Sequence, residues 1–163
     1  MEYNEKAYKV FEMFSKQKGL ATAGNIDDYN CCTIGWGSLG NIWDRGTNIV
    51  TIYINPDRYT WKYCMEKDYF TVSFFPEEYM PDLRVLGTKS GRDGDKIALT
   101  KLHPVALENG VYYQEATLTF VCRKLYQGEF EREGLADKIN NGIYKDWHPH
   151  YMFVGEIIDV IEK

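Results

Sequence analysis

The chain lacks the features that mark metalloproteins, membrane proteins and nucleic-acid-binding proteins. Its four cysteines form no CxxC pair and no zinc-ligand spacing, and its three histidines form no HExxH motif, so we expect no metal site. No uninterrupted apolar run approaches the length that spans a membrane. The 19 Lys and Arg residues are outnumbered by 24 Asp and Glu, which gives a formal charge of −5. We therefore expect neither a nucleic-acid partner nor a membrane partner.

The composition is that of one folded domain. Residues 1–6 are polar and lack the apolar stretch of a signal peptide, so a reduced, cytoplasmic protein is the simplest interpretation. Aromatic residues reach 15%, and a chain so rich in rings must bury surface, which excludes disorder. A length of 163 residues fits a single domain over 1–163, because either half alone would have a poor core.

Hydrophobic patterning predicts seven or eight strands with short helices between them. The segment IVTIYI at 49–54 is the clearest strand, and Asn109-Gly110 between apolar runs predicts a hairpin of 104–107 with 111–114. The remaining expected elements are strands at 20–23, 31–36, 69–75, 116–126 and 151–161, a polar turn at 27–30, an N-terminal helix within 1–19, helices at 60–67 and in part of 76–86, and a helix-containing insertion at 127–150. No βαβ rhythm is present, so the pattern predicts a mainly β fold, an antiparallel barrel with peripheral helices.

Three segments carry glycine and polar residues that a plain barrel would not need. The first is Thr33-Ile34-Gly35-Trp36-Gly37-Ser38, where glycines at a strand end let a ligand approach the backbone closely. Peptide N–H and C=O groups at this strand end can contact the polar edge of a flat heterocycle. The alternative interpretation is a bulge or a bend of the barrel. Trp36, Tyr53, Tyr59 and Phe74 are candidate walls for such a ring.

The second segment is Asn55-Pro56-Asp57-Arg58-Tyr59-Thr60. Here a strand ends, proline stiffens the turn, and Thr60 is a candidate N-cap for the following helix. A helix N-terminus beside the guanidinium of Arg58 is suited to bind phosphate. A surface arginine beside an ordinary capping threonine would give the same pattern.

The third segment is Lys89-Ser90-Gly91-Arg92-Asp93, with Lys96 one turn further on. In an acidic chain this is the densest cluster of positive charge, and an anionic ligand needs such a cluster. The segment is not a Walker loop, because GxxxxGK[ST] is absent. The alternative is that Ser90 or Asp93 caps a helix and the cations form a solvated face.

The order of these motifs identifies a family resemblance. Together with Phe70-Thr71-Val72-Ser73-Phe74-Phe75 and the closing Tyr151-Met152-Phe153-Val154-Gly155-Glu156-Ile157, they resemble the flavin reductase-like family of FMN-binding split barrels, which includes flavoredoxin. The resemblance covers roughly residues 20–160. It implies a six-stranded antiparallel split barrel with a Greek-key core, and a homodimer with an FMN site near each end of the interface.

The resemblance also implies roles for individual residues. The residues expected to bind FMN are Thr33, Ile34, Gly35, Trp36, Asn55, Arg58, Tyr59, Thr60, Ser73, Lys89, Ser90, Gly91, Asp93 and Lys96. Ser73 would lie beside the flavin, and Lys89, with Lys96 as second choice, would place positive charge near the pyrimidine edge of the ring. His150 is a possible residue near the flavin, whereas Cys31 and Cys32 inherit no role.

Three functions are compatible with the sequence. The first is an oxidoreductase in which flavin N5 accepts a hydride from NAD(P)H and reduces flavin or another small acceptor. The second is an FMN-carrying electron-transfer protein that a protein partner reduces. The third is a binding module that keeps the barrel without the cofactor. A thiol enzyme on Cys31 or Cys32 is a remote fourth, because no histidine is near in sequence. Arg132, in the polar insertion, is expected to have no part in retaining FMN.

Overall fold

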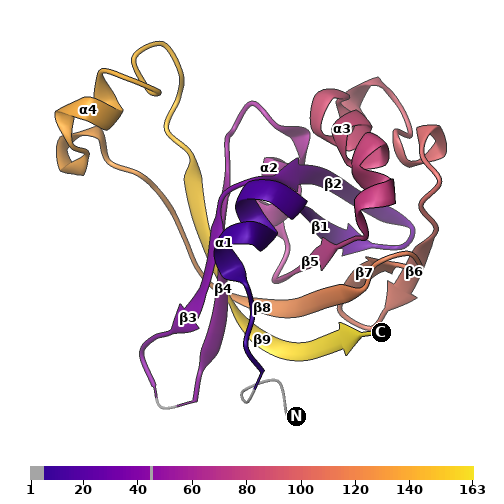
Figure 1. Ribbon diagram of the computed structural model, residues 1–163. Coiled ribbons are helices and arrows are strands. Elements are labelled where there is room, and N and C mark those ends of the chain that lie inside the picture. The colour runs from indigo at the N-terminus through magenta and orange to yellow at the C-terminus, as the bar shows by residue number, and fades with distance from the viewer. Residues whose placement is uncertain (1–5, 45) are drawn as a thin grey trace.

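The computed structural model describes residues 6–44 and 46–163 (Figure 1). It contains an antiparallel seven-stranded sheet with the order β2-β1-β5-β8-β9-β4-β3, and a separate hairpin of β6 with β7. The strands are β1 (Gly19–Asn25), β2 (Asp28–Ile34), β3 (Gly37–Asn41), β4 (Asn48–Ile54), β5 (Tyr69–Phe74), β6 (Pro104–Leu107), β7 (Gly110–Tyr113), β8 (Leu118–Glu129) and β9 (Tyr151–Glu162). The sheet curls without closing, so the predicted mainly β split barrel is confirmed, with β3 as an additional edge strand.

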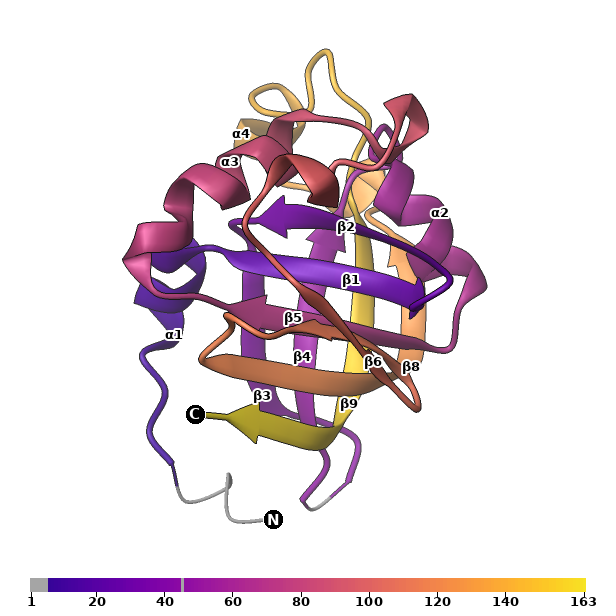
Figure 2. The ribbon, with the colours of Figure 1, turned by 90° about the vertical axis from the view of Figure 1, so that its right-hand side faces the viewer.

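The sheet curves because its two longest strands bend together. β8 and β9 each span 12 residues and pair along their length, with register irregularities at Val121/Cys122 and Lys124/Tyr126. Such irregularities increase local twist and let a strand turn the corner of a barrel. Figure 2 shows both strands curving around the molecule. The C-terminal half of β8 therefore extends beyond the barrel and leads into the insertion, and the N-terminal half of β9 leads out of it.

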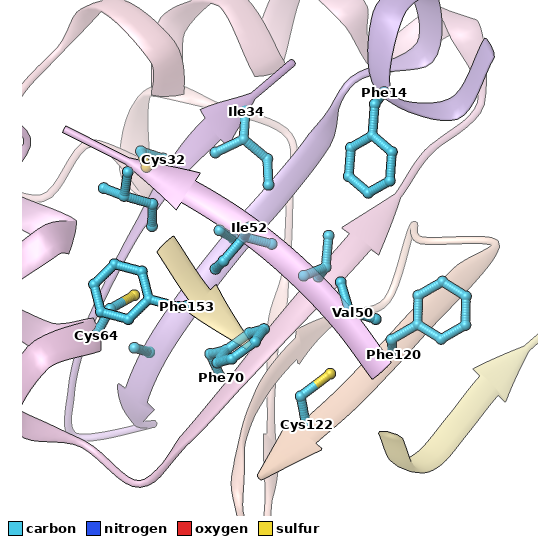
Figure 3. Packing of buried hydrophobic residues seen from close by; sticks show 14 of the residues in the cluster. Phe14, Cys32, Ile34, Val50, Ile52, Cys64, Phe70, Phe120, Cys122 and Phe153 are labelled. Carbon is cyan, nitrogen blue, oxygen red and sulfur yellow. The ribbon is translucent and has the colours of Figure 1, made fainter. Parts of the chain in front are cut away.

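Alternation along the strands divides the interior into two cores. Inside the barrel, Val50, Ile52, Phe70, Phe120 and Phe153 are almost fully buried (Figure 3). A second cluster lies between the sheet and α3 (Met80–Thr88) and includes Leu20, Phe75, Leu83, Leu86 and Tyr113.

The adjacent cysteines confirm this division, because a strand directs successive side chains to opposite faces. Cys32 belongs to the barrel core and Cys31 to the cluster under α3. All four cysteines, including Cys64 and Cys122, are buried and free of disulfides.

Short helices surround the barrel. They are α1 (Val10–Glu12), which continues into a π-helical turn (Met13–Gln17), α2 (Tyr59–Glu66), α3 (Met80–Thr88) and α4 (Asp137–Asn140), with 3-10 turns at Glu77–Tyr79, Gly91–Asp93, Ile97–Leu99 and Arg132–Gly134. Pro81 lies in the first turn of α3, where a missing N–H costs no hydrogen bond. Among the residues with described positions, no helix is long and apolar enough to cross a membrane, and no group of side chains could hold a metal ion.

Several predicted boundaries are corrected. Residues 1–5 of the predicted N-terminal helix lie outside the described part, and the helical segment itself covers only 10–17. The predicted turn at 27–30 belongs largely to β2, because Asn25 pairs with Asp28 and closes a tight hairpin. β3 was not predicted, since its sequence GSLGN carries no strand pattern. β8 continues to Glu129, so the insertion begins later than residue 127.

Candidate functional site

Two adjoining cavities lie where the three predicted segments meet. The larger, about 140 Å³, is lined by Cys32, Thr33, Ile34, Gly35, Trp36, Tyr53, Ile54, Asn55, Arg58, Trp147 and His150. The smaller, about 70 Å³, is lined by Cys32, Asp57, Arg58, Tyr59, Thr60, Thr88, Lys89, Ser90, Gly91 and Lys96. We call them the ring cavity and the basic cavity. Cys32 and Arg58 line both, so the two cavities adjoin each other.

The basic cavity gathers positive charge at the N-terminus of α2. Arg58 is the N-cap residue of that helix, whose first N–H groups have no partner within the helix. Lys89 comes from the end of α3. Lys96 is only 6% exposed, and its Nζ donates to the carbonyl oxygens of Leu86 at 3.1 Å and Lys89 at 3.2 Å. Three cations and a helix N-terminus form a site suited to a phosphate group.

Burial lowers the pKa of the Lys96 ammonium, and the guanidinium of Arg58 acts in the same direction. Nearby thiols oppose this shift. Two carbonyl oxygens solvate the ammonium in place of water, which lets a charged lysine lie inside the protein. An anion in the basic cavity would stabilise the protonated form further.

The loop at 89–96 lies close against β2, and Gly91 makes this approach possible. A Cβ at Gly91 would overlap the side-chain amide of Asn30. Asn30 in turn accepts a hydrogen bond from the Thr60 hydroxyl at 2.7 Å, which connects α2 to β2. Thr60 is therefore not the predicted N-cap; it lines the cavity while its hydroxyl makes a buried contact between elements.

The ring cavity follows the end of an edge strand. β2 ends the order of the sheet that the structure describes, and residues 33–36, at and just beyond its end, line the cavity. Thr33 donates from its hydroxyl to the carbonyl oxygen of Leu83 at 2.5 Å, which holds this strand end against α3. Trp36 and Tyr53 provide aromatic walls. A cavity with aromatic walls beside a strand end suits a flat heterocycle.

His150 lies in the ring cavity with its ring against Trp36, the two centroids being 4.4 Å apart. The side chain is 7% exposed, and the Nδ1 atom lies 2.8 Å from the hydroxyl of Tyr144. Burial lowers the pKa of His150 to about 4; Arg58 contributes to the lowering and Asp57 opposes it. The imidazole is therefore neutral at physiological pH.

Side chains of the insertion cover the ring cavity. Trp147 lines it and donates its indole N–H to an oxygen of the Asp57 carboxylate at 2.9 Å. Asn55 donates to the carbonyl oxygen of His148 at 2.6 Å, while its own Oδ1 accepts the backbone N–H of Asp57 at 3.1 Å. The end of β4 thus holds the insertion in place over the cavity.

Arg132 fixes the fold of the insertion from within. Its guanidinium donates to the carbonyl oxygens of Tyr144 at 2.8 Å and Trp147 at 3.0 Å, and to Oδ1 of Asn140 at 2.8 Å. Two of these partners supply side chains at or behind the ring cavity. Arg132 lines neither cavity, but these contacts connect it to the ring cavity through the insertion, which is the reason to revise the prediction that it has no part in retaining FMN.

Most sequence-predicted residues meet at this site. Those in the ring cavity are Thr33, Ile34, Gly35, Trp36, Asn55, Arg58 and His150; those in the basic cavity are Arg58, Tyr59, Thr60, Lys89, Ser90, Gly91 and Lys96. Ser90 also caps the 3-10 turn at 91–93, because its Oγ accepts the N–H of Arg92 at 3.2 Å.

Some expectations are not met by this geometry. Ser73 is fully buried and shares a hydrogen bond of 2.8 Å with Thr119 in the sheet, and it lines neither cavity. Asp93 is exposed on the 3-10 turn and also lines neither. Lys89 and Lys96 line the basic cavity and not the ring cavity, so neither is placed beside the walls of the ring cavity.

Sequence reasoning did not single out Cys32 or Trp147, which line the cavities, or Tyr144, which lies behind the ring cavity. Cys32 lines both cavities, and burial raises the pKa of its thiol, so it contributes shape rather than a reactive thiolate. Trp147 and Tyr144 come from the insertion. The aromatic and histidine content of Trp147-His148-Pro149-His150 was a usable signal, but the polar residues before it indicated only a surface loop.

A larger apolar groove of about 580 Å³ opens beside the ring cavity and is lined from the N-terminal helical segment and the insertion. It shares Gly35, Trp36 and Tyr53 with that cavity. Its full lining is Val10, Phe11, Phe14, Ser15, Gly35, Trp36, Gly37, Tyr53, Phe130, Leu135, Ile139, Ile143 and Tyr144, none of them charged. Phe11 is 91% exposed here.

Comparisons with known proteins agree with this geometry. The sequence model described as "Flavin reductase like domain" matches residues 43–163, most of the chain. No curated protein matches the chain.

Solved structures show the same fold. Flavoredoxin from Methanosarcina acetivorans is 23% identical, with a TM-score of 0.70 over 97% of this chain and 74% of that one. An FMN-binding protein from Thermus thermophilus with bound p-hydroxybenzaldehyde is 17% identical, with a TM-score of 0.71 over 97% and 82%. Flavoredoxin of Desulfovibrio vulgaris is 20% identical, with a TM-score of 0.68 over 100% and 77%. At these identities the likeness is one of fold.

Proposed function

The chain belongs to the flavin reductase-like domain family, and on this premise we propose that it is an FMN-binding oxidoreductase. The observation that carries the proposal is the pair of adjoining cavities, one basic and one with aromatic walls beside the end of β2. FMN has the matching parts, a phosphate joined by a ribityl chain to a flat ring system. Solved structures of the same fold include proteins named as FMN-binding.

The residues present fit this cofactor. Arg58, Lys89 and Lys96 would hold the phosphate together with the N–H groups that begin α2. The absence of a side chain at Gly91 leaves room for the loop to close on β2. The backbone of residues 33–36 would bind the polar edge of the ring, and Trp36 and Tyr53 would exclude water from it.

FMN, when bound, supplies the redox chemistry by accepting a hydride and passing the electrons on. The chain orients the ring, partly excludes solvent and sets the charge around it. Arg58 lines both cavities, so it is the cation best placed to influence the ring as well as the phosphate. No protein nucleophile is required, which agrees with the raised pKa of the Cys32 thiol.

Absorption spectroscopy tests cofactor binding. Purified protein, as isolated or after addition of FMN and gel filtration, should carry a flavin spectrum in stoichiometric amount. A colourless protein that does not retain added FMN would contradict the proposal and favour a binding module that has kept the fold alone.

We propose NAD(P)H as the electron donor and free flavin or another small molecule as the acceptor, in keeping with the name of the family. Anaerobic mixing of the FMN-loaded protein with NADH or NADPH should bleach the flavin absorbance faster than buffer does. Bleaching no faster than in buffer would rule out both nicotinamides. The second candidate, an electron-transfer protein reduced by a protein partner, would then be favoured, as the neighbours named flavoredoxin suggest.

We further propose a homodimer in which a second copy covers the apolar groove. Phe11, Trp36 and Ile143 are 91%, 42% and 44% exposed there, and monomeric proteins rarely leave such a contiguous apolar surface in water. The groove also adjoins the ring cavity. Light scattering should give about twice the mass of one chain, and Phe11→Asp should shift the mass toward that of one chain. A monomeric wild-type protein would contradict the homodimer and would favour a small apolar substrate as the occupant of the apolar groove.

A further inference from the structure

We propose that Tyr144 positions His150 as a neutral imidazole whose proton is on Nε2, so that His150 presents a hydrogen-bond donor to the ring cavity. The inference deepens the proposed function, because the acceptor for this donor would be the polar edge of the FMN ring. The tautomer itself depends only on residues of this chain.

The hydrogen bonds around Tyr144 indicate that its hydroxyl donates to Nδ1 of His150. The backbone N–H of His150 donates to the Tyr144 hydroxyl oxygen at 3.3 Å, so that oxygen already serves as an acceptor. The hydroxyl hydrogen is then free to donate to Nδ1 of His150, 2.8 Å away. Asn55 directs a second donor, its Nδ2 group, toward the same Nδ1 atom at 3.5 Å. The Asn55 Nδ2 group can only donate, and the Tyr144 hydroxyl has a hydrogen to give, so both contacts favour an unprotonated Nδ1; a neutral imidazole then carries its proton on Nε2.

The surrounding charges keep the ring neutral. Asp57 and Arg58 are the charged groups that face His150, and they act in opposite directions on its pKa. Trp36 packs on one side of the imidazole, and Trp147 meets it nearly at right angles with centroids 4.8 Å apart. Burial among these rings disfavours the imidazolium, so only one nitrogen carries a proton.

The Nε2–H group is the donor that remains for a ligand in the ring cavity, because Nδ1 is already engaged by Tyr144 and Asn55. Nδ1 faces Tyr144 and Asn55, while the same ring lines the ring cavity beside Trp36. Nε2 lies on the ring edge away from Nδ1. An N–H group there complements a carbonyl oxygen or an unprotonated ring nitrogen, and it does so without adding charge.

Tyr144 can act in this way because the insertion holds it. The side chain is 3% exposed, and its carbonyl oxygen accepts from Arg132 at 2.8 Å. Neither Arg132 nor Tyr144 lines the ring cavity, so neither would contact a bound ring; both act through His150. Both are positioning residues.

Nitrogen-15 NMR of the cofactor-free protein tests the tautomer directly. The chain has three histidines, and His103 and His148 are paired with Glu115 and Glu129, so they serve as internal references. At pH 7 we expect the His150 shifts of an Nε2–H imidazole, unchanged down to about pH 5. An Nδ1–H tautomer, or an imidazolium at pH 7, would overturn the proposal.

Tyr144→Phe removes the hydroxyl and keeps the ring. We expect the Nδ1 signal of His150 to shift and the Nε2–H fraction to fall, while Tyr112→Phe, which changes a hydroxyl on the β6–β7 hairpin, leaves both unchanged. An unaltered His150 spectrum in a folded Tyr144→Phe protein would show that Asn55 or the backbone fixes the tautomer instead. Folding is verified by the amide spectrum of the β-sheet.

Addition of FMN separates this inference from the proposed function. If FMN binds and shifts the Nε2–H resonance of His150 but not that of His103, the donor faces the cofactor. Tyr144→Phe should then weaken FMN binding by about two- to tenfold, as the loss of one neutral hydrogen bond implies. FMN that binds without moving the His150 resonance would overturn the presentation of the donor. Failure to bind FMN would overturn the proposed function, with the tautomer decided by the cofactor-free spectrum.

Discussion

At the scale of single residues, Arg58 has the central position in the site. It joins β4 to α2, begins the helix, and lines both cavities. The sequence predicted its role from a strand end, a proline and a following helix. Its contact with the ring cavity could not be predicted, because that depends on how the insertion folds back over β4.

Arg58→Ala should weaken FMN retention. The change removes a charge-assisted contact to phosphate, worth on the order of 1.5–3 kcal/mol, or roughly 10- to 150-fold in Kd. Fluorescence titration of cofactor-free protein with FMN measures it. Arg84→Ala is the matched control, since Arg84 is exposed on α3 and lines neither cavity. Equal affinities in the two variants would contradict the phosphate assignment.

His150 makes stability depend on pH. Its pKa is about 4 in the folded protein and near 6.5 when unfolded, so the unfolded chain binds the proton more readily. The resulting stabilisation is fully present above pH 6.5 and is lost as pH falls toward 4, by up to roughly 3 kcal/mol at 1.36 kcal/mol per pKa unit. Urea unfolding at pH 7 and pH 5 should show a smaller loss for His150→Gln than for wild type. Equal losses of unfolding free energy in the two proteins between pH 7 and pH 5 would mean that His150 is protonated in the folded state.

At the scale of elements, local patterns were sufficient for most strands. The Asn109-Gly110 signal gave the β6–β7 hairpin, and the β-branched residues of 49–54 gave β4. β3 escaped prediction because its residues are mostly exposed and its pairing with β4 decides its conformation. The insertion likewise has little regular structure of its own, and side-chain contacts to its carbonyl oxygens hold it together.

Arg132→Ala should loosen the insertion while the barrel stays intact. It removes a charged donor from two carbonyl oxygens, and hydrogen bonds to charged groups are worth about 1.5–3 kcal/mol each. Amide exchange should therefore accelerate at Tyr144 and Lys145, whose N–H groups bond within the insertion. We also expect weaker FMN retention.

Two variants sharpen this test. Lys138→Ala changes an exposed residue of α4 and should leave both exchange and retention as in wild type. Arg132→Lys should restore part of the protection, because an ammonium can still donate to one carbonyl oxygen. Unchanged exchange in Arg132→Ala would show that the insertion is held by Asn55 and Trp147 alone.

At the scale of the whole molecule, the barrel depends on close packing across β9. A Cβ at Gly155 would lie 2.6 Å from Cβ of Cys122 and 2.6 Å from the ring of Phe70. Both neighbours are fully buried on β8 and β5 and have no room to move. Glycine at this position lets the strands pack around an aromatic ring.

Gly155→Ala should therefore lower the free energy of unfolding by about 1–3 kcal/mol, the usual cost of overpacking a core. Chemical denaturation measures the change. Gly134→Ala is the comparison, because nothing lies within 4 Å of a Cβ there, and we expect a change within about 0.5 kcal/mol. A Gly155→Ala protein as stable as wild type would show that the core relaxes around the added methyl group.

The sequence alone determined the mainly β fold, the family, and the three segments that supply most of the site. Those features are local: strand alternation, turn residues, and cations clustered within a few positions. Only the tertiary structure decided that Ser73 points into the sheet, that Cys32 lies between the two cavities, and that Trp147 and His150 cover the larger one. These placements depend on contacts between residues some 30 to 100 positions apart, such as Asn55 with His148 and Trp147 with Asp57. No local pattern encodes such contacts, because they exist only once the barrel brings its strand ends together.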